Sequence, residues 1–388
     1  MNRPAWIYLV IFLVVFCFRL KAKTSFQLPA KAQVRLTSFL TNTPVVSGGE
    51  ISFFFNGFRI KTSRSFLTES LSYGDRLVIQ GQPEAKRVNR FYQQFWLIGP
   101  EIKVVPQTKP PLFSFLNWLA KAREEMISLI NQSLPEPQAS LMAGILLGEK
   151  RQMPADFFQA LQTTGTLHII AASGMNLTFF AFPLMNGLAL FLKRKLALFI
   201  SLVCILVYCF LAGASPAVVR AAIMVGLSLM AVFFGREGAG LWSLILTATL
   251  MLLVQPLLVF DTGFQLSCSA MAGIICLKPR LQRFCLFRRR TLVKLGDNFW
   301  ETLSATIATA PVLMLTFGRF SPFSVIPNLF VLPLIPYLMA LGGLLIFTAW
   351  LYLPLGQLFG WLSWPALTYF VEIINFFGQF DWLNFGSD

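Results

Sequence analysis

Apolar runs separated by short polar loops fill the chain from Thr166 to about residue 378. Several of these runs approach the roughly 20 residues that a helix needs to cross the hydrocarbon core of a bilayer. Over the whole chain 56% of the residues are hydrophobic and only 13% are charged, which excludes an ordinary soluble domain. The sequence therefore predicts a polytopic α-helical membrane protein.

Nine membrane spans can be drawn on this pattern. Residues 1–23 predict an N-terminal transmembrane anchor, because the apolar run Trp6–Phe18 is followed by no small-residue cleavage signal. A cleaved signal peptide is the alternative for this segment. The other eight spans lie at about 166–191, 196–213, 216–234, 240–255, 257–277, 298–317, 323–349 and 355–378.

Loop charge predicts the orientation of these spans. With the N-terminus inside, the basic loops Lys193–Lys195, Arg236 and Lys278–Lys294 all fall on the cytoplasmic side. The alternate loops carry a single charge among them. Because cytoplasmic loops are enriched in Lys and Arg, we expect the N-terminus inside and residues 30–108 outside.

Residues 30–108 show short alternating runs broken by Gly, Pro and Asn, which is typical of a small β-domain. Asn56-Gly57 is the favoured two-residue turn of a β-hairpin. Two further strands are predicted at Arg76–Gln80 and Phe95–Ile98.

The strand that follows this turn has two chemically different faces. Phe58, Ile60 and Thr62 share one face, while Arg59 and Lys61 share the other. The pattern therefore predicts a basic face opposite a core face.

Basic residues outnumber acidic ones in residues 31–106, with ten Lys or Arg against five Asp or Glu. Such a surface suits anionic partners, either phospholipid headgroups or nucleic acid, and a merely solvated face explains it equally well. Phe53, Phe55 and Trp96 would offer stacking surfaces for bases if they were exposed. The candidate DNA-binding residues are Arg59, Lys61, Arg64 and Arg76.

The segment 111–164 predicts amphipathic and short apolar helices. Residues 112–134 mix apolar positions with charges such as Lys121 and Arg123, which predicts an amphipathic helix that is too charged to span a membrane. Leu141–Leu147 is apolar but far too short to span. We expect this run to be either re-entrant or buried.

The single histidine of the chain, His168, lies in the run Gly165–Asn176. On one helix His168, Ser173 and Asn176 would form one polar arc, and Ser173-Gly174 could unwind that helix to expose backbone amides. Polar groups within hydrocarbon are functional-site candidates. A packing role for the histidine is about as plausible.

Two later spans also begin with polar residues. Ser215-Pro216 is typical of an N-cap followed by proline at the first helical position. Arg220 lies one turn further on, so free amides and a guanidinium would form an anion site. Asp261 is expected to cap a helix that presents Gln265, and to lie deep enough to pair with Arg220. The alternatives are that Arg220 only snorkels to the interface and that Asp261 is only a cap.

Catalytic chemistry fits this pattern poorly. Ser173 and His168 would point about 140° apart on one helix, so an intramembrane serine hydrolase would need local unwinding. A single histidine with sparse acidic residues does not complete a metal site. We therefore predict no catalytic residue, no metal, no cofactor and no enzymatic activity.

Four motifs resemble the ComEC family of competence-type DNA-internalisation channels. In chain order they are Gly165–Gly174, Gly213–Ala221, Asp261–Ser267 and Thr309–Gly318, and the resemblance covers most of residues 138–345. Many members of that family have a histidine where this chain has Asn176. Many also carry a metallo-β-lactamase-like nuclease domain, so the resemblance is to a short form without it.

The family resemblance implies a fold class and a domain organisation. The fold class is a polytopic α-helical membrane protein with a small N-terminal all-β, OB-like extracytoplasmic domain. The location that the resemblance implies is the bacterial cytoplasmic (inner) membrane. The domains are an anchor at 1–23, an OB-like β-domain at 30–108, amphipathic and short apolar helices at 111–164, and a competence-type transmembrane channel domain at 165–378.

The resemblance also implies a function, an inner-membrane channel that conducts single-stranded DNA into the cytoplasm during natural transformation. The alternatives are a polytopic small-solute transporter or an intramembrane hydrolase using Ser173. The implied partners are single-stranded DNA, the phospholipid membrane, an extracytoplasmic DNA receptor, a cytosolic helicase-like ATPase, a separate nuclease and single-strand binding proteins. The expected path residues are His168, Ser173, Gly174, Asn176, Ser215, Pro216, Arg220, Asp261, Gln265 and Ser267.

Overall fold

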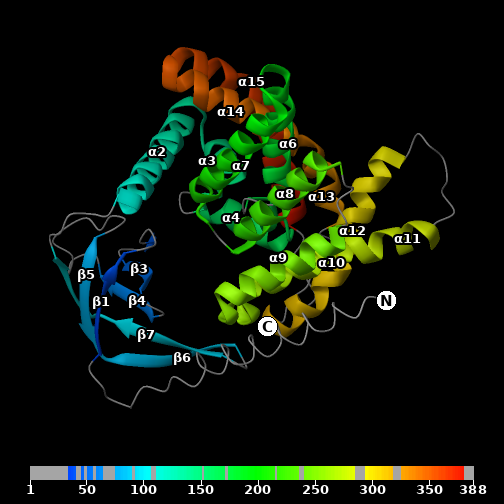
Figure 1. Ribbon diagram of the computed structural model, residues 1–388. Helices are drawn as coiled ribbons and strands as arrows, with labels where there is room; N and C mark the ends of the chain where they lie inside the picture. The colour runs from blue at the N-terminus through cyan, green and yellow to red at the C-terminus, as the bar shows by residue number, and fades with distance from the viewer. Residues whose placement is uncertain are drawn as a thin grey trace. The chain divides into compact units, whose positions relative to one another are not determined.

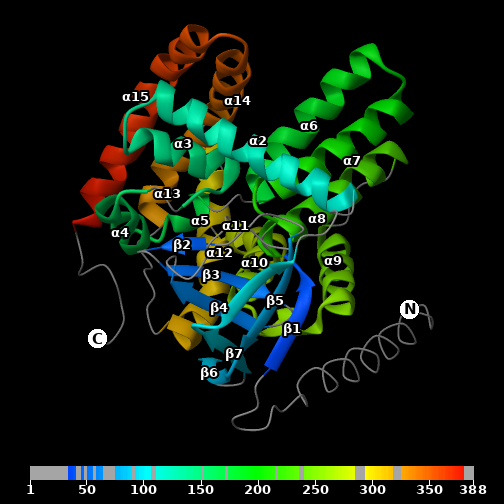
Figure 2. The same ribbon diagram turned by 90° about the vertical axis from the view of Figure 1, so that its left-hand side faces the viewer.

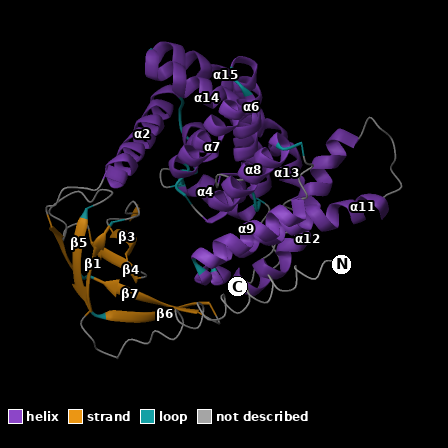
Figure 3. Ribbon diagram, in the orientation of Figure 1, coloured by secondary structure: helices purple, strands orange, loops and turns teal. Residues whose placement is uncertain are grey.

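The computed structural model describes residues 34–40, 45–47, 50–55, 58–63, 75–89, 92–105, 111–150, 153–170, 174–214, 216–235, 240–284, 293–317 and 325–379. These residues form two compact units, one up to Glu125 and one from Met126 onward. The described strands all belong to the first unit and most helices to the second (Figure 1 and Figure 3). The predicted anchor at residues 1–23 lies outside the described residues.

Alternating sequence patterns produce the strands of the first unit. Strand β5 shows the pattern most clearly, because Leu77 and Ile79 are fully buried while their neighbours are not. The strands are β1 Val34–Phe39, β2 Val45–Ser47, β3 Glu50–Phe55, β4 Phe58–Ser63, β5 Arg76–Gly81, β6 Pro83–Asn89, β7 Tyr92–Ile98 and β8 Glu101–Val105.

The strands pair in two separate sheets. One sheet has the order β1-β5-β8 and the other the order β2-β3-β4-β7-β6, in which only β4 and β7 are parallel (Figure 2). Only Gln82 separates β5 from β6, and only Gly99-Pro100 separates β7 from β8. Gly99 has a φ of 60°, a conformation that glycine adopts without strain, and it lets the chain bend from one sheet into the other.

The predicted hairpin and the predicted faces are confirmed. Strands β3 and β4 pair antiparallel with Phe55 opposite Phe58, while the turn itself lies outside the described residues. Ile60 is fully buried, and Arg59 and Lys61 on the opposite face are half-buried. Phe53 is also in the core. The core residues are Leu36, Leu40, Phe53, Phe55, Phe58, Ile60, Leu77, Ile79 and Leu97.

The second unit is helical, and helix α2 (Pro111–Ser133) runs into it. Each of the eight later spans drawn from the sequence contains helix. The further helices are α3 Gln138–Leu147, α4 Ala155–Thr163, α5 Leu167–Ile170, α6 Gly174–Phe191, α7 Arg194–Leu211, α8 Pro216–Phe233, α9 Gly240–Val254, η2 Pro256–Phe260, α10 Thr262–Ala272, η3 Gly273–Leu277, α11 Lys278–Phe284, α12 Val293–Phe317, α13 Val325–Val331, η5 Leu332–Leu334, α14 Ile335–Leu351 and α15 Leu353–Gly378.

Two stretches of helix among the described residues are long and apolar enough to cross a membrane. They are Arg194–Leu211 and Val325–Leu351, which lie within or around the predicted spans 196–213 and 323–349. Shorter apolar helices occupy Gln138–Leu147, Asn176–Phe191, Ala217–Phe233 and Gly240–Val254. The structure thus supports two of the nine predicted spans by length.

The predicted loop Lys278–Lys294 is wrong in its first part, because Lys278–Phe284 forms helix α11. An ion pair between Lys278 and Glu301 ties the start of α11 to α12. Arg280 donates to the Cys276 carbonyl oxygen one turn earlier. These basic side chains therefore have local partners that a count of loop charges does not reveal.

Helix α3 lies at the centre of the main helical core. All ten of its residues are buried, and it packs against α5, α14 and α15. Gly342 of α14 allows this approach, because a β-carbon there would lie 2.5 Å from the sulfur of Met142. The buried alternative for Leu141–Leu147 is confirmed.

Candidate functional site

The first turns of α8 and α10 carry the polar residues that the sequence singled out. Pro216 is the first residue of α8, as predicted, while Ser215 lies outside the described residues. Asp261 caps α10, and its Oδ1 accepts a hydrogen bond of 2.7 Å from the Phe264 backbone amide. The predicted helix cap at Asp261 is confirmed.

Arg220 is the most unusual side chain of this region. It is only 5% exposed, and its Nε and Nη1 atoms have no hydrogen-bond partner among the described residues. Its guanidinium interacts with the side chain of Cys268 on α10. A buried charge normally has a paired opposite charge, so this arrangement calls for a ligand or another function.

The predicted pairing of Arg220 with Asp261 is wrong for the described structure. No ion pair joins the two side chains, and the carboxylate of Asp261 accepts from the Phe264 backbone amide of its own helix. The guanidinium lies beside Cys268, almost two turns further along α10. The carboxylate is an N-cap, and the arginine keeps its charge unpaired.

Gln265 and Ser267 both lie on α10 and are partly buried. The Nε2 of Gln265 donates to the Val259 carbonyl oxygen at 2.7 Å, which ties α10 to the preceding turn η2. Gln265 therefore has a structural partner, and its place along a DNA path stays a prediction, as does that of Ser267.

Asn176 is fully buried and has a structural role. Its Nδ2 donates to the Ile145 carbonyl oxygen at 2.9 Å. Tyr208 of α7 donates to the Leu146 carbonyl oxygen at 2.8 Å. These two side chains satisfy consecutive carbonyl groups at the C-terminal end of α3, where no intrahelical amide is available.

Two further carbonyl groups at this end of α3 accept bonds from the chain that follows it. Gly148, with a left-handed φ of 68°, and Glu149 donate backbone hydrogen bonds to the carbonyl oxygens of Gly144 and Ala143. The end of α3 is thus fixed by its own chain and by two other helices. The side-chain amide of Asn176 thereby holds the end of α3.

The histidine motif is only partly described. His168 lies in the short helix α5, and Gly174 is the first residue of α6. The side chain of His168 and the whole of Ser173 lie outside the described part of the chain, as does the peptide between the two helices. The predicted polar arc of His168, Ser173 and Asn176 therefore stays a prediction.

Three buried polar side chains of the helical unit were missed by the sequence analysis. Thr247 of α9 and Ser304 of α12 are fully buried, and their hydroxyl groups have no partner among the described residues. The Oδ1 of Asn328 on α13 is also buried without a hydrogen-bond partner among the described residues. Nothing in their spacing marks them, because helical Ser and Thr usually bond a carbonyl of the preceding turn, as Ser201 does with Ala197.

The predicted basic face of the β-unit is organised around one contact. The Arg59 guanidinium lies 4.7 Å from the centre of the Trp96 ring, and the two residues are partners across β4 and β7. Lys61 follows on the same strand face, and Arg76 is exposed at the start of β5. Arg64 lies outside the described residues.

Phe53 and Phe55 do not meet the condition of exposure under which they were expected to stack with bases. Their exposed fractions are 4% and 2%, and both belong to the core of the β-unit. The hairpin register turns both residues inward with Ile60, while Phe54 and Trp96, the cross-strand partners of Arg59, lie on the basic face.

Comparison with known proteins matches most of the helical unit. The family model described as Competence protein matches residues 145–387. The chain is 27% identical over 256 residues to ComE operon protein 3 of Bacillus subtilis (strain 168), an alignment that covers 65% of this chain and 31% of that protein. It is 26% identical over 230 residues to uncharacterized protein YcaI of Escherichia coli (strain K12), covering 55% of this chain and 29% of that protein.

The chain spans less than a third of the length of each of these two curated relatives. No solved structure matches the chain. The matched residues include Arg220, Asp261 and Asn176.

Proposed function

This chain belongs to the competence protein family, and we propose that it acts in DNA uptake as an inner-membrane channel that conducts single-stranded DNA into the cytoplasm during natural transformation. The observation that carries the proposal is Arg220, a cation buried without a charged partner inside the region that the family model matches. An ionisable residue in such surroundings is a functional-site candidate.

The charge of DNA explains why a channel would keep such a residue. Each phosphodiester carries a negative charge, and moving it out of water is costly unless a cation compensates it. A guanidinium stays charged when buried and recognises phosphate oxygens with directed N–H groups. Arg220 already has unused donors, so a passing phosphate would need to break no existing ion pair.

The surface of the helical unit supports a membrane location. Many of its large apolar side chains are exposed, among them Leu190 at 81%, Phe191 at 87% and Leu315 at 89%. Apolar surface on this scale marks a lipid or protein contact. We propose a multi-pass protein with the N-terminus inside, in which the shorter apolar helices also take part in the membrane domain.

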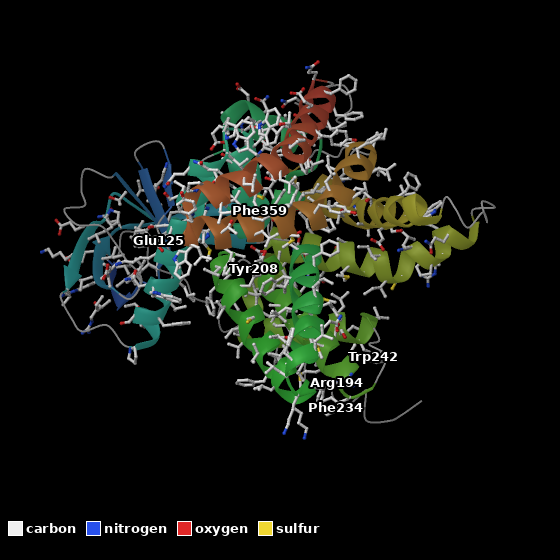
Figure 4. All side chains as sticks on the ribbon, turned by 90° about the horizontal axis from the view of Figure 1, so that it is seen from above. Glu125, Arg194, Tyr208, Phe234, Trp242 and Phe359 are labelled. Carbon is white, nitrogen blue, oxygen red and sulfur yellow. The ribbon has the colours of Figure 1, made fainter. Side chains whose placement is uncertain are left out.

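Arg194, Phe234 and Trp242 lie at the same end of the helical unit (Figure 4). Arg194 donates to the Val232 carbonyl oxygen at the end of α8, and Phe234 and Trp242 are 66% and 67% exposed. Basic and aromatic side chains together are typical of a membrane–water interface on the cytoplasmic side. This combination supports the proposed orientation.

The β-unit is proposed to be an OB-like domain outside the membrane. In one sheet β2 pairs with β3, β3 with β4, β4 with β7 in parallel and β7 with β6, while in the other β1 pairs with β5, and β1 and β5 directly precede β2 and β6 in the chain. That order is the one expected of an OB fold, whose strand face binds oligonucleotides. The Arg59–Trp96 contact would then offer a stacking platform with a positive charge.

Energy must come from outside the channel. An inward-moving phosphate opposes an inside-negative potential, at roughly 2.3 kcal/mol per charge for each 100 mV. We therefore propose a cytosolic helicase-like ATPase and single-strand binding proteins as partners, with an extracytoplasmic DNA receptor and a separate nuclease upstream.

Replacement of Arg220 tests the proposal. Arg220→Gln is expected to lower uptake of labelled DNA by cells at least about tenfold, because a phosphate would lose its counter-charge. Arg194→Gln is the matched control, since Arg194 is exposed and binds a backbone carbonyl. Membrane protein levels are measured in parallel. Normal uptake by an Arg220→Gln variant present at normal levels would sink the proposed path.

A further inference from the structure

We propose that Arg220 of α8 and Thr247 of α9, beside Cys268 of α10, form a binding site for one phosphate-type oxyanion inside the helical unit. The inference rests on the proposed function, because the phosphodiester of DNA is one source of such an oxyanion. Free inorganic phosphate is the other.

The first argument is the unmatched charge of Arg220. The side chain is 95% buried, and among the described residues no carboxylate pairs with it. Its Nε–H group and both Nη1–H groups have no hydrogen-bond acceptor in the described part of the protein. A buried ion without a partner is unfavourable, so an anion that supplies acceptors would lower the free energy of the folded state.

The second argument is the position of Thr247. Helix α9 begins beside η3, where a β-carbon on Gly240 would lie 3.5 Å from Ile275. Because η3 directly follows α10, the start of α9 lies near the end of α10, and the two packed helices run in opposite directions.

The register then places Thr247 near the guanidinium. Thr247 lies seven residues after Gly240 on α9. Cys268 lies seven residues before Ile275. Equal steps along two antiparallel helices reach the same level, and Cys268 is the residue with which Arg220 interacts. The Thr247 hydroxyl, fully buried and without a partner in the described structure, is thus brought to the level of the unused guanidinium donors.

The donor chemistry selects an oxyanion. A guanidinium offers only N–H donors, a hydroxyl can donate, and a thiol is a weak donor. Phosphate oxygens accept several such bonds, and charge-assisted bonds to them are the strong ones. The carboxylate of Asp261, seven residues before Cys268, is engaged with the Phe264 amide. The site therefore favours phosphate oxygens over a metal cation.

Phosphate binding can be measured on the purified full chain in detergent. Equilibrium dialysis with radiolabelled inorganic phosphate is expected to give saturable binding of one phosphate per chain in a background of constant ionic strength. A short oligothymidylate is expected to compete for that phosphate. If the free ion alone occupied the site, phosphate would bind and the oligonucleotide would not displace it.

Two variants test the proposed ligands. Arg220→Gln is expected to weaken phosphate binding at least about tenfold. Thr247→Val keeps the side-chain volume but removes the hydroxyl and is expected to weaken binding roughly threefold to tenfold. Thr348→Val is the matched control, because the Thr348 hydroxyl already donates to the Leu344 carbonyl oxygen, and it is expected to bind like the wild-type chain.

The outcomes separate the two proposals. Absence of saturable phosphate binding by the wild-type chain would overturn the site, whether or not Arg220→Gln folds. If phosphate does not bind but Arg220→Gln still abolishes DNA uptake, the site is wrong and the proposed function stands. If phosphate binds and uptake by Arg220→Gln is normal, the site stands and the DNA path does not. Equal binding by Thr247→Val and Thr348→Val would remove Thr247 from the site.

Discussion

The two units of this protein place polar and apolar side chains in opposite ways. In the β-unit, Phe53 and Ile60 are buried while Arg59 and Arg76 lie toward the surface. In the helical unit, Arg220 is buried and large apolar residues such as Leu315 are exposed. A surface that faces water must be largely polar, whereas a surface that faces lipid need not be. This contrast agrees with the proposal that the helical unit faces lipid and the β-unit faces water.

The difference also concerns how each unit is held together. The β-unit buries apolar volume between sheets, as a water-soluble domain does. In the helical unit glycines bring helices into close approach, for example Gly273 against Ser304, a packing typical of helices in membranes. Substitutions should therefore destabilise the β-unit by leaving cavities in its apolar core and the helical unit by disturbing close helix contacts.

The largest expected effect is in the core of the β-unit. Ile60→Ala should lower its free energy of unfolding by about 3 kcal/mol, because Ile60 is fully buried and a cavity would remain. Denaturant unfolding of the full chain in detergent measures the change. The control is Ile98→Ala, whose side chain is 55% exposed. Equal losses for the two variants would contradict the assigned core.

Close helix packing predicts the next effect. A β-carbon on Gly273 would lie 2.6 Å from the Ser304 carbonyl oxygen and 2.5 Å from the β-carbon of Ala308. Gly273→Ala should therefore destabilise the helical unit by about 2 kcal/mol through overpacking. Gly343→Ala serves as control, because no atom lies within 4 Å of its added carbon. Thermal unfolding in detergent compares the two, and an unchanged midpoint for Gly273→Ala would refute the close contact.

Loss of a helix cap should be smaller. Tyr208→Phe removes the donor to the Leu146 carbonyl oxygen and should cost about 1–2 kcal/mol, because a buried acceptor is left unsatisfied. Tyr337→Phe, at a position that is 69% exposed, is the control. Unfolding midpoints measured in one detergent decide the question. A Tyr208→Phe variant as stable as Tyr337→Phe would show that this hydrogen bond does not stabilise α3.

The smallest effect concerns the proposed binding of DNA by the β-unit. Arg59→Ala should weaken binding of a labelled oligothymidylate about twofold to fivefold more than Arg35→Ala does, because only Arg59 lies over the Trp96 ring. Both variants remove one positive charge from the same unit, so the general electrostatic loss is matched. Fluorescence anisotropy at a fixed salt concentration measures the affinity of each variant for the oligothymidylate. Identical affinities of the two variants would count against the Arg59–Trp96 platform.

Local patterns were sufficient for several features of the fold. Alternation around Asn56-Gly57 predicted the β3–β4 hairpin and its two faces, because side chains on a strand alternate with a fixed period. Asp261 was predicted as a cap for a similar reason, since N-cap chemistry involves only the next three residues. Both features depend on residues that are close together in the sequence.

The roles of individual polar residues were less predictable. Asn176 and Gln265 looked like path residues, yet each donates to a backbone carbonyl. The partner of Asn176 is 31 residues away in the sequence, and no periodicity identifies it. In the same way Phe53 and Phe55 became core residues when the strands closed into sheets.

The sequence alone determined that this chain has a β-rich part with a basic face and an apolar helical part, because solvent preference and periodicity are properties of each segment. Its motifs also determined the family. Only the tertiary structure decided that Arg220 lies beside Cys268 without pairing with Asp261, and that Asn176 and Tyr208 hold the end of α3. These contacts join helices distant in sequence, so their partners depend on how the helices pack.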